Sequence, residues 1–150
     1  MRLTSTAFKH LGSIPSKYTC DGDEVNPPLT IEDVPKSAKS LVLIMDDPDA
    51  VKVAGKIWDH WVVWNIAPTT KIIAENSVPE GAVQGRNSWS TNTYGGPCPP
   101  HGEHRYVFKL YALDITLNPT TSATKKDVEQ AMKGHVLEQT ELVGVYKRER

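Results

Sequence analysis

The sequence predicts a mainly β protein, an antiparallel β-sandwich with a C-terminal helix, in a single domain over residues 1–150. Short segments rich in β-branched and aromatic residues recur along the chain, which is typical of strands. Clusters of Pro, Gly, Asn and Asp separate these segments and indicate turns. One segment alone has helical periodicity, and a chain with many strands and few helices usually packs two sheets face to face.

The candidate strands are residues 29–31, 40–45, 60–66, 70–73, 104–113 and 140–146. The clearest is 104–113, "HRYVFKLYAL", whose alternate residues form two faces that are both apolar apart from Lys109. A half-buried strand would alternate between polar and apolar residues, so this pattern indicates a strand that is buried on both faces inside the sandwich.

The helix is predicted to begin after Thr124, because Asp127 three residues later completes a capping box with Asp in place of Glu. Its apolar stripe follows the spacing i, i+3, i+4, i+7 and i+8 and consists of Val128, Ala131, Met132, His135 and Val136. Gly134 lowers the helical propensity near the end of this stripe.

Length and composition narrow the class of protein. The chain of 150 residues suits one domain with a proper core, and its formal net charge of −1 argues against binding to nucleic acid. The N-terminal residues alternate between polar and apolar, unlike a signal peptide, and no apolar run is long enough for a transmembrane segment. We therefore expect a cytoplasmic protein.

Cys20 and Cys98 are too few for a disulfide framework or for a zinc site on their own. Reduced thiols are the expectation. A disulfide between them is the alternative, and it would require a geometry that a sequence does not show.

Three clusters of residues could carry chemistry. In "DDPDAV", residues 46–51, the carboxylates are typical of a turn at the end of a strand. The alternative is a metal site, although hard cations usually need more oxygen ligands than Asp47 and Asp49 supply. His60 lies between tryptophans in "WDHWVVWNI", residues 58–66, where a packed structural histidine is the simplest interpretation.

The third cluster is the loop "YGGPCPPHGEHRY", residues 94–106, which is too rich in Gly and Pro for a regular element. A zinc site there would use Cys98, His101 and His104, but their spacing is not that of a standard zinc motif.

Together these clusters resemble the phosphatidylethanolamine-binding protein family. The motifs that carry the resemblance are, in order, Asp47-Pro48-Asp49-Ala50, Trp58-x-His60-Trp61 with Asn65, Gly95-Gly96-Pro97-Cys98-Pro99-Pro100, and His104-Arg105-Tyr106. The stretch "YTCDGDEVNPPL", residues 18–29, is similar to the form found in the bacterial and archaeal members, the Raf-kinase-inhibitor-like group. The resemblance extends from about Phe8 to Tyr146.

The resemblance implies a β-sandwich with an anion-binding pocket at one end, which takes phosphorylated head groups or small phosphate ligands and needs no cofactor or metal. The residues it implies for ligand binding are Asp47, His60, Gly96, Pro97, His104 and Tyr106, with Asp49 and Trp58 at neighbouring motif positions. Val51 stands where the family usually has a proline, and the stretch from Gly102 to His104 is shorter than in many relatives.

Physical arguments explain why such residues suit an anion. Successive N–H groups of a glycine loop can form an anion-binding nest, and prolines fix that loop in advance. An aspartate that accepts a hydrogen bond from one ring nitrogen of a histidine would orient the other ring nitrogen toward a phosphate. Trp58 or Tyr106 could offer a ring face to the ammonium of phosphoethanolamine.

The leading hypothesis is a non-enzymatic binding protein, which could also act as an inhibitor or regulator of a protease or kinase, as the resemblance suggests for some relatives. The alternative is a hydrolase-like enzyme with an Asp47/His60 acid–base pair acting on a bound phosphate ester, although the sequence has no recognisable nucleophile motif. A fold with a vestigial pocket is a third reading. Prokaryotic relatives lead us to expect a homodimer.

Overall fold

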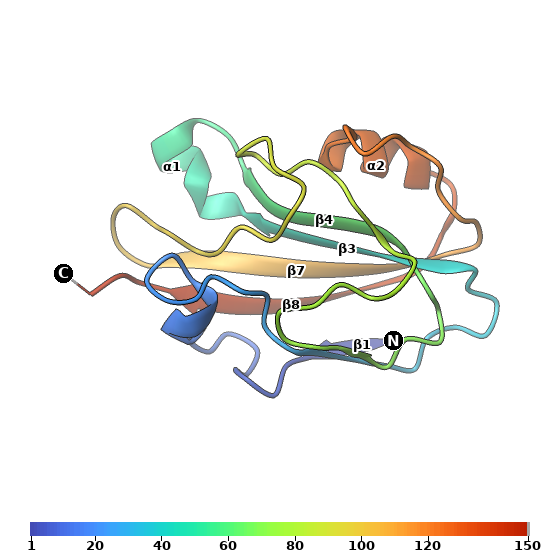
Figure 1. Cartoon of the computed structure of the whole chain (residues 1–150), viewed down its shortest axis with the longest axis horizontal. Coiled ribbons are helices and arrows are strands. Elements are labelled where there is room, and N and C mark those ends of the chain that lie inside the picture. The colour runs from blue at the N-terminus through green and yellow to red at the C-terminus, as the bar shows by residue number, and fades with distance from the viewer. Residues whose placement is uncertain (150) are drawn as a thin grey trace.

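The computed structural model describes residues 1–149, which form two antiparallel β-sheets (Figure 1). The smaller sheet has the order β1-β2-β5 and the larger one β6-β4-β3-β7-β8. In chain order the strands are β1 (Arg2–Thr4), β2 (Leu29–Glu32), β3 (Ser40–Asp47), β4 (Trp58–Ile66), β5 (Ile72–Ile73), β6 (Val83–Gln84), β7 (His104–Leu113) and β8 (Val136–Tyr146). The predicted antiparallel sandwich is confirmed.

The helical elements are short. They are the 3₁₀ turns η1 (Ser16–Tyr18) and η2 (Pro48–Ala50) and the α-helices α1 (Val51–Ala54) and α2 (Lys125–Met132). Figure 1 shows α1 and α2 at opposite ends of the long strands. None of the helices in residues 1–149 has the length and apolar character that crossing a bilayer requires.

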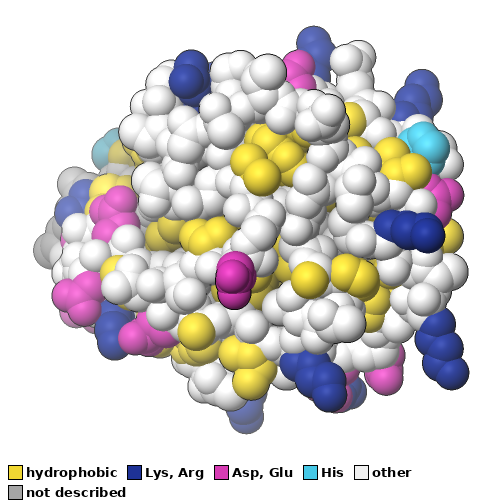
Figure 2. All heavy atoms as spheres, turned by 45° about the vertical axis from the view of Figure 1, so that its right-hand side comes forward, with side chains coloured by type: hydrophobic (Ala, Val, Ile, Leu, Met, Phe, Trp, Pro, Cys, Tyr) yellow, Lys and Arg dark blue, Asp and Glu magenta, His cyan; other side chains and the backbone are white. Residues whose placement is uncertain are grey.

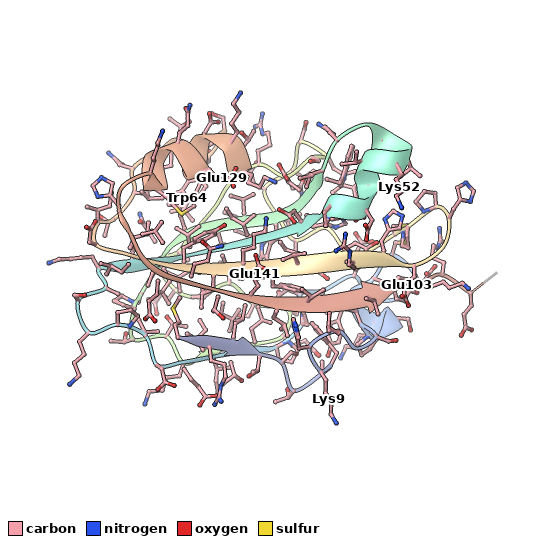
Figure 3. The ribbon with its side chains drawn as sticks, turned by 180° about the vertical axis from the view of Figure 1, so that it is seen from behind. Lys9, Lys52, Trp64, Glu103, Glu129 and Glu141 are labelled. Carbon is pink, nitrogen blue, oxygen red and sulfur yellow. A yellow bond between two sulfur atoms is a disulfide. The ribbon has the colours of Figure 1, made fainter. Side chains whose placement is uncertain are left out.

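The central strands β3, β4 and β7 of the larger sheet are buried on both faces, which explains their continuous apolar runs, whereas the edge strand β8 is largely exposed. On one face, Leu41 and Leu43 of β3 belong to the main core between the two sheets. On the other face, Val42 of β3 and Trp64 of β4 pack in a second cluster with Val128 of α2. Figure 3 shows Trp64 beneath this helix. The prediction that residues 104–113 form a strand buried on both faces is confirmed.

The predicted elements all occur, but several boundaries differ. The strand 104–113 has the predicted bounds, whereas β3 and β4 are each two residues longer than expected at the end that carries Asp47 and Trp58. Sequence patterns missed β1, β6 and α1, which are at most four residues long. Elements of that length form through their tertiary neighbours more than through local preference.

The C-terminal helix is shorter than its apolar stripe. The N–H of Thr124 donates to the Asp127 carboxylate at 3.0 Å, which confirms the capping box. The helix ends at Met132, and Gly134 adopts a left-handed φ of 83°. His135 lies beyond the helix and Val136 begins β8, so the predicted helical positions of both residues are wrong. Pairing of β8 along the whole of β7 outweighs the helical pattern there.

Cys20 and Cys98 form a disulfide, so the expectation of reduced thiols is wrong. Their Cα atoms lie 5.4 Å apart, a distance that a disulfide accommodates. The N–H of Cys20 also donates to the carbonyl of Pro97 at 3.1 Å. The segment after η1 is thereby fixed to the Gly- and Pro-rich loop at residues 94–103.

Charged side chains of both signs are scattered over the face shown in Figure 2, and no large patch of a single sign is visible on it. With a formal net charge of −1, this distribution offers no basic surface for a nucleic acid on that face.

Candidate functional site

Three strand ends meet at one end of the larger sheet. β3 ends at Asp47, β4 begins at Trp58 opposite it, and β7 begins at His104. The turn η2, the helix α1 and the loop 94–103 surround these ends (Figure 1). A cavity of about 360 Å³ lies between them. Of the predicted site residues, the structure brings together along this cavity Asp47, Trp58, His60, His104 and Tyr106.

Asp47 is almost fully buried and uses both carboxylate oxygens. Its Oδ1 accepts the N–H groups of Asp49 and Ala50 at 2.9 and 3.1 Å, which caps the turn η2. Its Oδ2 accepts the Nδ1–H of His104 at 2.7 Å. Burial raises the pKa of the Asp47 carboxyl, and the hydrogen bond from His104 opposes that rise. Asp47 therefore fixes the His104 ring and leaves its Nε2 for a ligand.

His60 is held differently. Its Nδ1 lies 2.7 Å from the carbonyl oxygen of Gly95, which can only accept, so Nδ1 carries the proton. Burial lowers the pKa of His60 to about 4, and the ring is neutral near pH 7. Its Nε2 is then a hydrogen-bond acceptor. The direct Asp47–His60 pair of the hydrolase hypothesis does not form, because Asp47 binds His104 instead.

Two donors in the cavity wall are unused. The hydroxyl of Tyr106 and the indole N–H of Trp58 are buried, and among residues 1–149 neither donates a hydrogen bond of good geometry, although the backbone at Cys98 lies close enough to the Tyr106 hydroxyl oxygen to oppose the rise in its pKa. Burial raises the pKa of Tyr106, so its hydroxyl keeps its proton. A buried polar group without a partner costs free energy comparable to a lost hydrogen bond. Both residues line the cavity, where a ligand would supply the missing acceptors.

Asp49 lies beside the cavity and does not line it. Its carboxylate accepts hydrogen bonds from the Arg105 backbone N–H and from two nitrogens of the Arg105 guanidinium, at 2.8 to 3.1 Å. These bonds lower the pKa of Asp49 to about 2. The Asp49–Arg105 pair links η2 to the beginning of β7 and so stabilises the position of the neighbouring His104.

Gly96 and Pro97, which the resemblance implied for ligand binding, do not line the cavity. The N–H of Gly95 donates to the carbonyl of His60 at 2.9 Å, which differs from the free N–H expected for an anion nest. A Cβ on Gly96 would lie 2.7 Å from the carbonyl oxygen of Tyr18. In this loop the glycines permit close packing, while Pro99 and Pro100 form part of the wall.

Trp89 is a cavity residue that the sequence patterns did not reveal. Its ring centroid lies 4.9 Å from that of His60 and 5.6 Å from that of Trp58, with the rings nearly perpendicular in both pairs. A single tryptophan in a polar loop carries no periodic signal. The missing side chain of Gly95 makes room for the Trp89 ring, a contact that only the tertiary structure reveals.

Residues 1–149 contain no group of three or more His, Cys, Asp or Glu side chains that could hold a metal ion. The zinc hypothesis at Cys98 is excluded in this structure, because the disulfide removes the thiolate that zinc requires.

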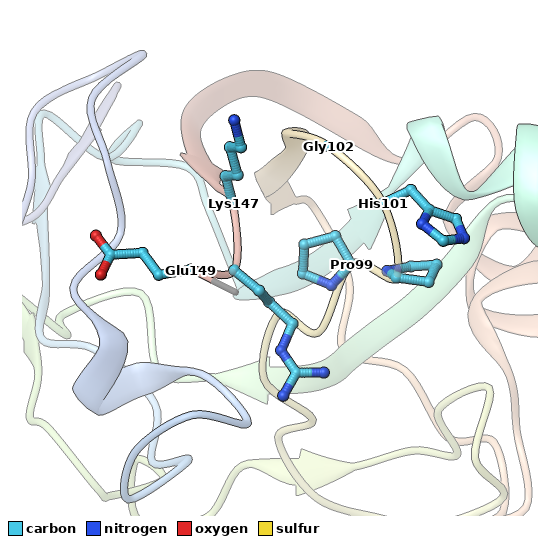
Figure 4. Close-up of a pocket in the computed structure, with 7 residues that line it drawn as sticks. Pro99, His101, Gly102, Lys147 and Glu149 are labelled. Carbon is cyan, nitrogen blue, oxygen red and sulfur yellow. The ribbon is translucent and has the colours of Figure 1, made fainter.

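A second hollow, of about 600 Å³, lies on the other side of the loop, between residues 99–102 and 147–149 (Figure 4). Its Arg148 is paired with Asp21 at 2.8 Å. Among the described residues, no buried polar atom without a partner belongs to this hollow. The cavity at Asp47 is therefore the better candidate for a binding site.

The fold is a β-sandwich with a cavity at the end of its larger sheet. Residues 4–147 match the family model described as "Phosphatidylethanolamine-binding protein". The chain therefore belongs to the phosphatidylethanolamine-binding protein family, and its membership supports a binding-protein role.

Relatives and solved structures agree with this assignment. A protein of Methanothermobacter thermautotrophicus named "UPF0098 protein" is 50% identical, with 99% of each chain covered. A Chlamydia trachomatis crystal structure, titled a putative phosphatidylethanolamine-binding protein homologue, has a TM-score of 0.93 at 43% identity and covers 98% of this chain and 97% of its own. Escherichia coli YbcL, titled a new member of the mammalian family, has a TM-score of 0.90 at 30% identity, with 99% and 98% covered.

Proposed function

We propose that this protein binds small phosphorylated ligands, such as phosphate monoesters or phospholipid head groups, in the cavity at Asp47. The observation that carries the proposal is the pair of buried donors without partners, the Tyr106 hydroxyl and the Trp58 indole N–H, in the wall of one cavity. The cavity volume of about 360 Å³ falls in the range of small-molecule sites.

The hydrogen-bonding groups suit a phosphate that retains a proton or carries an amine. The Tyr106 hydroxyl and the Trp58 indole N–H donate, and the bond between Nδ1–H of His104 and Asp47 leaves the His104 Nε2 for the ligand. His60 accepts at Nε2, because its Nδ1–H is bound to the carbonyl of Gly95. The site thus offers two donors, from Tyr106 and Trp58, and the Nε2 acceptor of His60, which match the oxygens of a phosphate and one N–H or O–H of the ligand.

Isothermal titration calorimetry with inorganic phosphate and phosphoethanolamine, on the wild type and on Tyr106→Phe, tests the proposal. Loss of one hydrogen bond to a charged ligand should weaken binding about tenfold or more. Tyr111→Phe is the matched control, because Tyr111 lies on the same strand but in the cluster on the opposite face of the sheet. It should leave the affinity within about twofold.

Failure of the wild type to bind either compound would overturn the proposal. Equal effects of Tyr106→Phe and Tyr111→Phe would also contradict it, because the donor in the cavity would then have no special role.

The buried Asp47–His104 pair is the observation that favours the hydrolase alternative. In acid–base catalysis, a carboxylate often orients a histidine in this way. Turnover of a phosphate ester that disappears in His104→Gln would support it. Saturable binding without turnover favours the binding protein.

Further predictions concern partners and location. A homodimer, an inhibitory contact with a protease or kinase, and a cytoplasmic location remain predictions. The disulfide bears on the last of these, since disulfides persist mainly in oxidising compartments and in intracellular proteins of hyperthermophiles. Sedimentation velocity and fractionation of cells are the direct measurements.

A further inference from the structure

Trp89 is presented at the cavity by a loop whose backbone is fixed on both sides. The buried side chain of Asn87 accepts at Oδ1 the N–H groups of Trp89 and Thr91, at 2.9 and 3.1 Å. Its Nδ2 donates to the carbonyl of Thr93 at 2.8 Å. The Ser88 N–H donates to the carbonyl of Asp59, and the Asp59 N–H donates back to Ser88 Oγ. The loop is thus attached to β4 close to His60.

The indole of Trp89 is only partly covered by its neighbours. A Cβ placed on Gly95 would lie 2.2 Å from an atom of the Trp89 ring, so the ring rests directly on the Gly95 backbone. His60 and Trp58 pack against it, yet 45% of Trp89 remains exposed. A large aromatic ring that is fixed this firmly and still half exposed on a cavity is typical of a ligand contact.

The cavity is also larger than a bare phosphate requires. The donors that suit the phosphate group belong to Tyr106 and Trp58, and both lie beside the Trp89 ring or its neighbours. An organic group bonded to that phosphate would extend along the remaining wall, where Trp89 supplies an apolar surface. The neighbouring Trp58 ring already makes a cation–π contact, because the ammonium of Lys56 lies 5.2 Å from its centre.

We propose that Trp89 is a specificity-determining residue, whose indole contacts the organic substituent of a phosphate monoester and makes the cavity prefer such an ester to inorganic phosphate. The inference rests on the proposed function, because it assumes that the phosphate binds at Tyr106 and Trp58. It goes further in assigning the recognition of the substituent to a residue outside the family motifs quoted above.

The test compares the dissociation constants of three probes by calorimetry. Inorganic phosphate has no substituent, phosphoethanolamine carries an ammonium, and propyl phosphate carries an apolar chain of similar length. In the wild type both esters should bind more tightly than inorganic phosphate. Trp89→Ala should weaken the esters about three- to thirtyfold and leave inorganic phosphate within about twofold. Trp89→Phe should keep most of the preference, because it retains an aromatic wall.

Ile72→Ala is the control, since Ile72 is exposed on the smaller sheet and does not line the cavity. It should change none of the three constants. Unchanged binding of inorganic phosphate to Trp89→Ala also shows that the variant is folded. A larger loss for phosphoethanolamine than for propyl phosphate supports the inference and identifies the contact as cation–π, while equal losses support it as an apolar contact.

Other results would overturn the inference. If the wild type binds all three probes and Trp89→Ala leaves the preference for the esters unchanged, the role assigned to Trp89 is wrong, while the proposed function stands. Equal weakening of inorganic phosphate and the esters would make Trp89 a support for the anion site and contradict its role in selectivity. If the wild type binds none of the probes, the proposed function itself fails.

Discussion

Removal of the Cys20–Cys98 disulfide should destabilise the protein substantially. The two cysteines are 78 residues apart in sequence, so the cross-link restricts a long loop of the unfolded chain. A loop of that length corresponds to about 4.5 kcal/mol of chain entropy at 25 °C in the standard loop-closure model. Cys98 is exposed and Cys20 partly exposed, so replacing both with Ala removes little packing, and the change in stability should come mainly from the lost cross-link.

Urea denaturation of Cys20→Ala/Cys98→Ala and of the wild type, with and without reductant, measures this difference. We expect a loss of about 3–4 kcal/mol in the free energy of unfolding, because residual structure in the unfolded chain reduces the ideal value. Reductant should lower the stability of the wild type by a similar amount and leave the double variant unchanged. A loss below about 1 kcal/mol in the variant would refute the reasoning from loop length.

Three further predictions concern the cavity end of the sheet. The pKa of His60 is about 4 in the folded protein and 6.5 in the unfolded chain, so the wild type should lose roughly 2–3 kcal/mol of stability through this group between pH 7 and 4.5. His60→Asn, which keeps an N–H for the Gly95 carbonyl, should abolish this part of the loss. Unfolding curves at both pH values test this, with the exposed His101→Asn as control. Asp49→Asn should cost about 1 kcal/mol at pH 7 and progressively less as the pH falls from 3.8 toward 2, in denaturation measurements, while the affinity for phosphate stays within twofold. Gly96→Ala should lower the free energy of unfolding by about 2 kcal/mol, since its Cβ would meet backbone; an unchanged thermal midpoint would contradict this packing role.

Local patterns in the sequence were enough to predict the class of fold and most of the strands. Residues 104–113 were recognisable because a strand buried on both faces needs apolar residues at almost every position. Residues 124–132 were recognisable as a helix through their capping box and apolar stripe. Such signals are local, and each is contained in a dozen consecutive residues. The resemblance to a family then supplied Asp47, Trp58, His60, His104 and Tyr106, which the structure brings to one cavity.

Which of those residues form hydrogen bonds with one another depends on the tertiary structure. The aspartate Asp47 could have paired with either His60 or His104, and only the register of β3 against β4 and β7 selects His104. The disulfide likewise depends on two segments 78 residues apart meeting with the right geometry. Trp89 joins the cavity because Gly95 leaves space for its ring. Contacts of this kind are set by packing between distant segments, and no local pattern in the sequence encodes them.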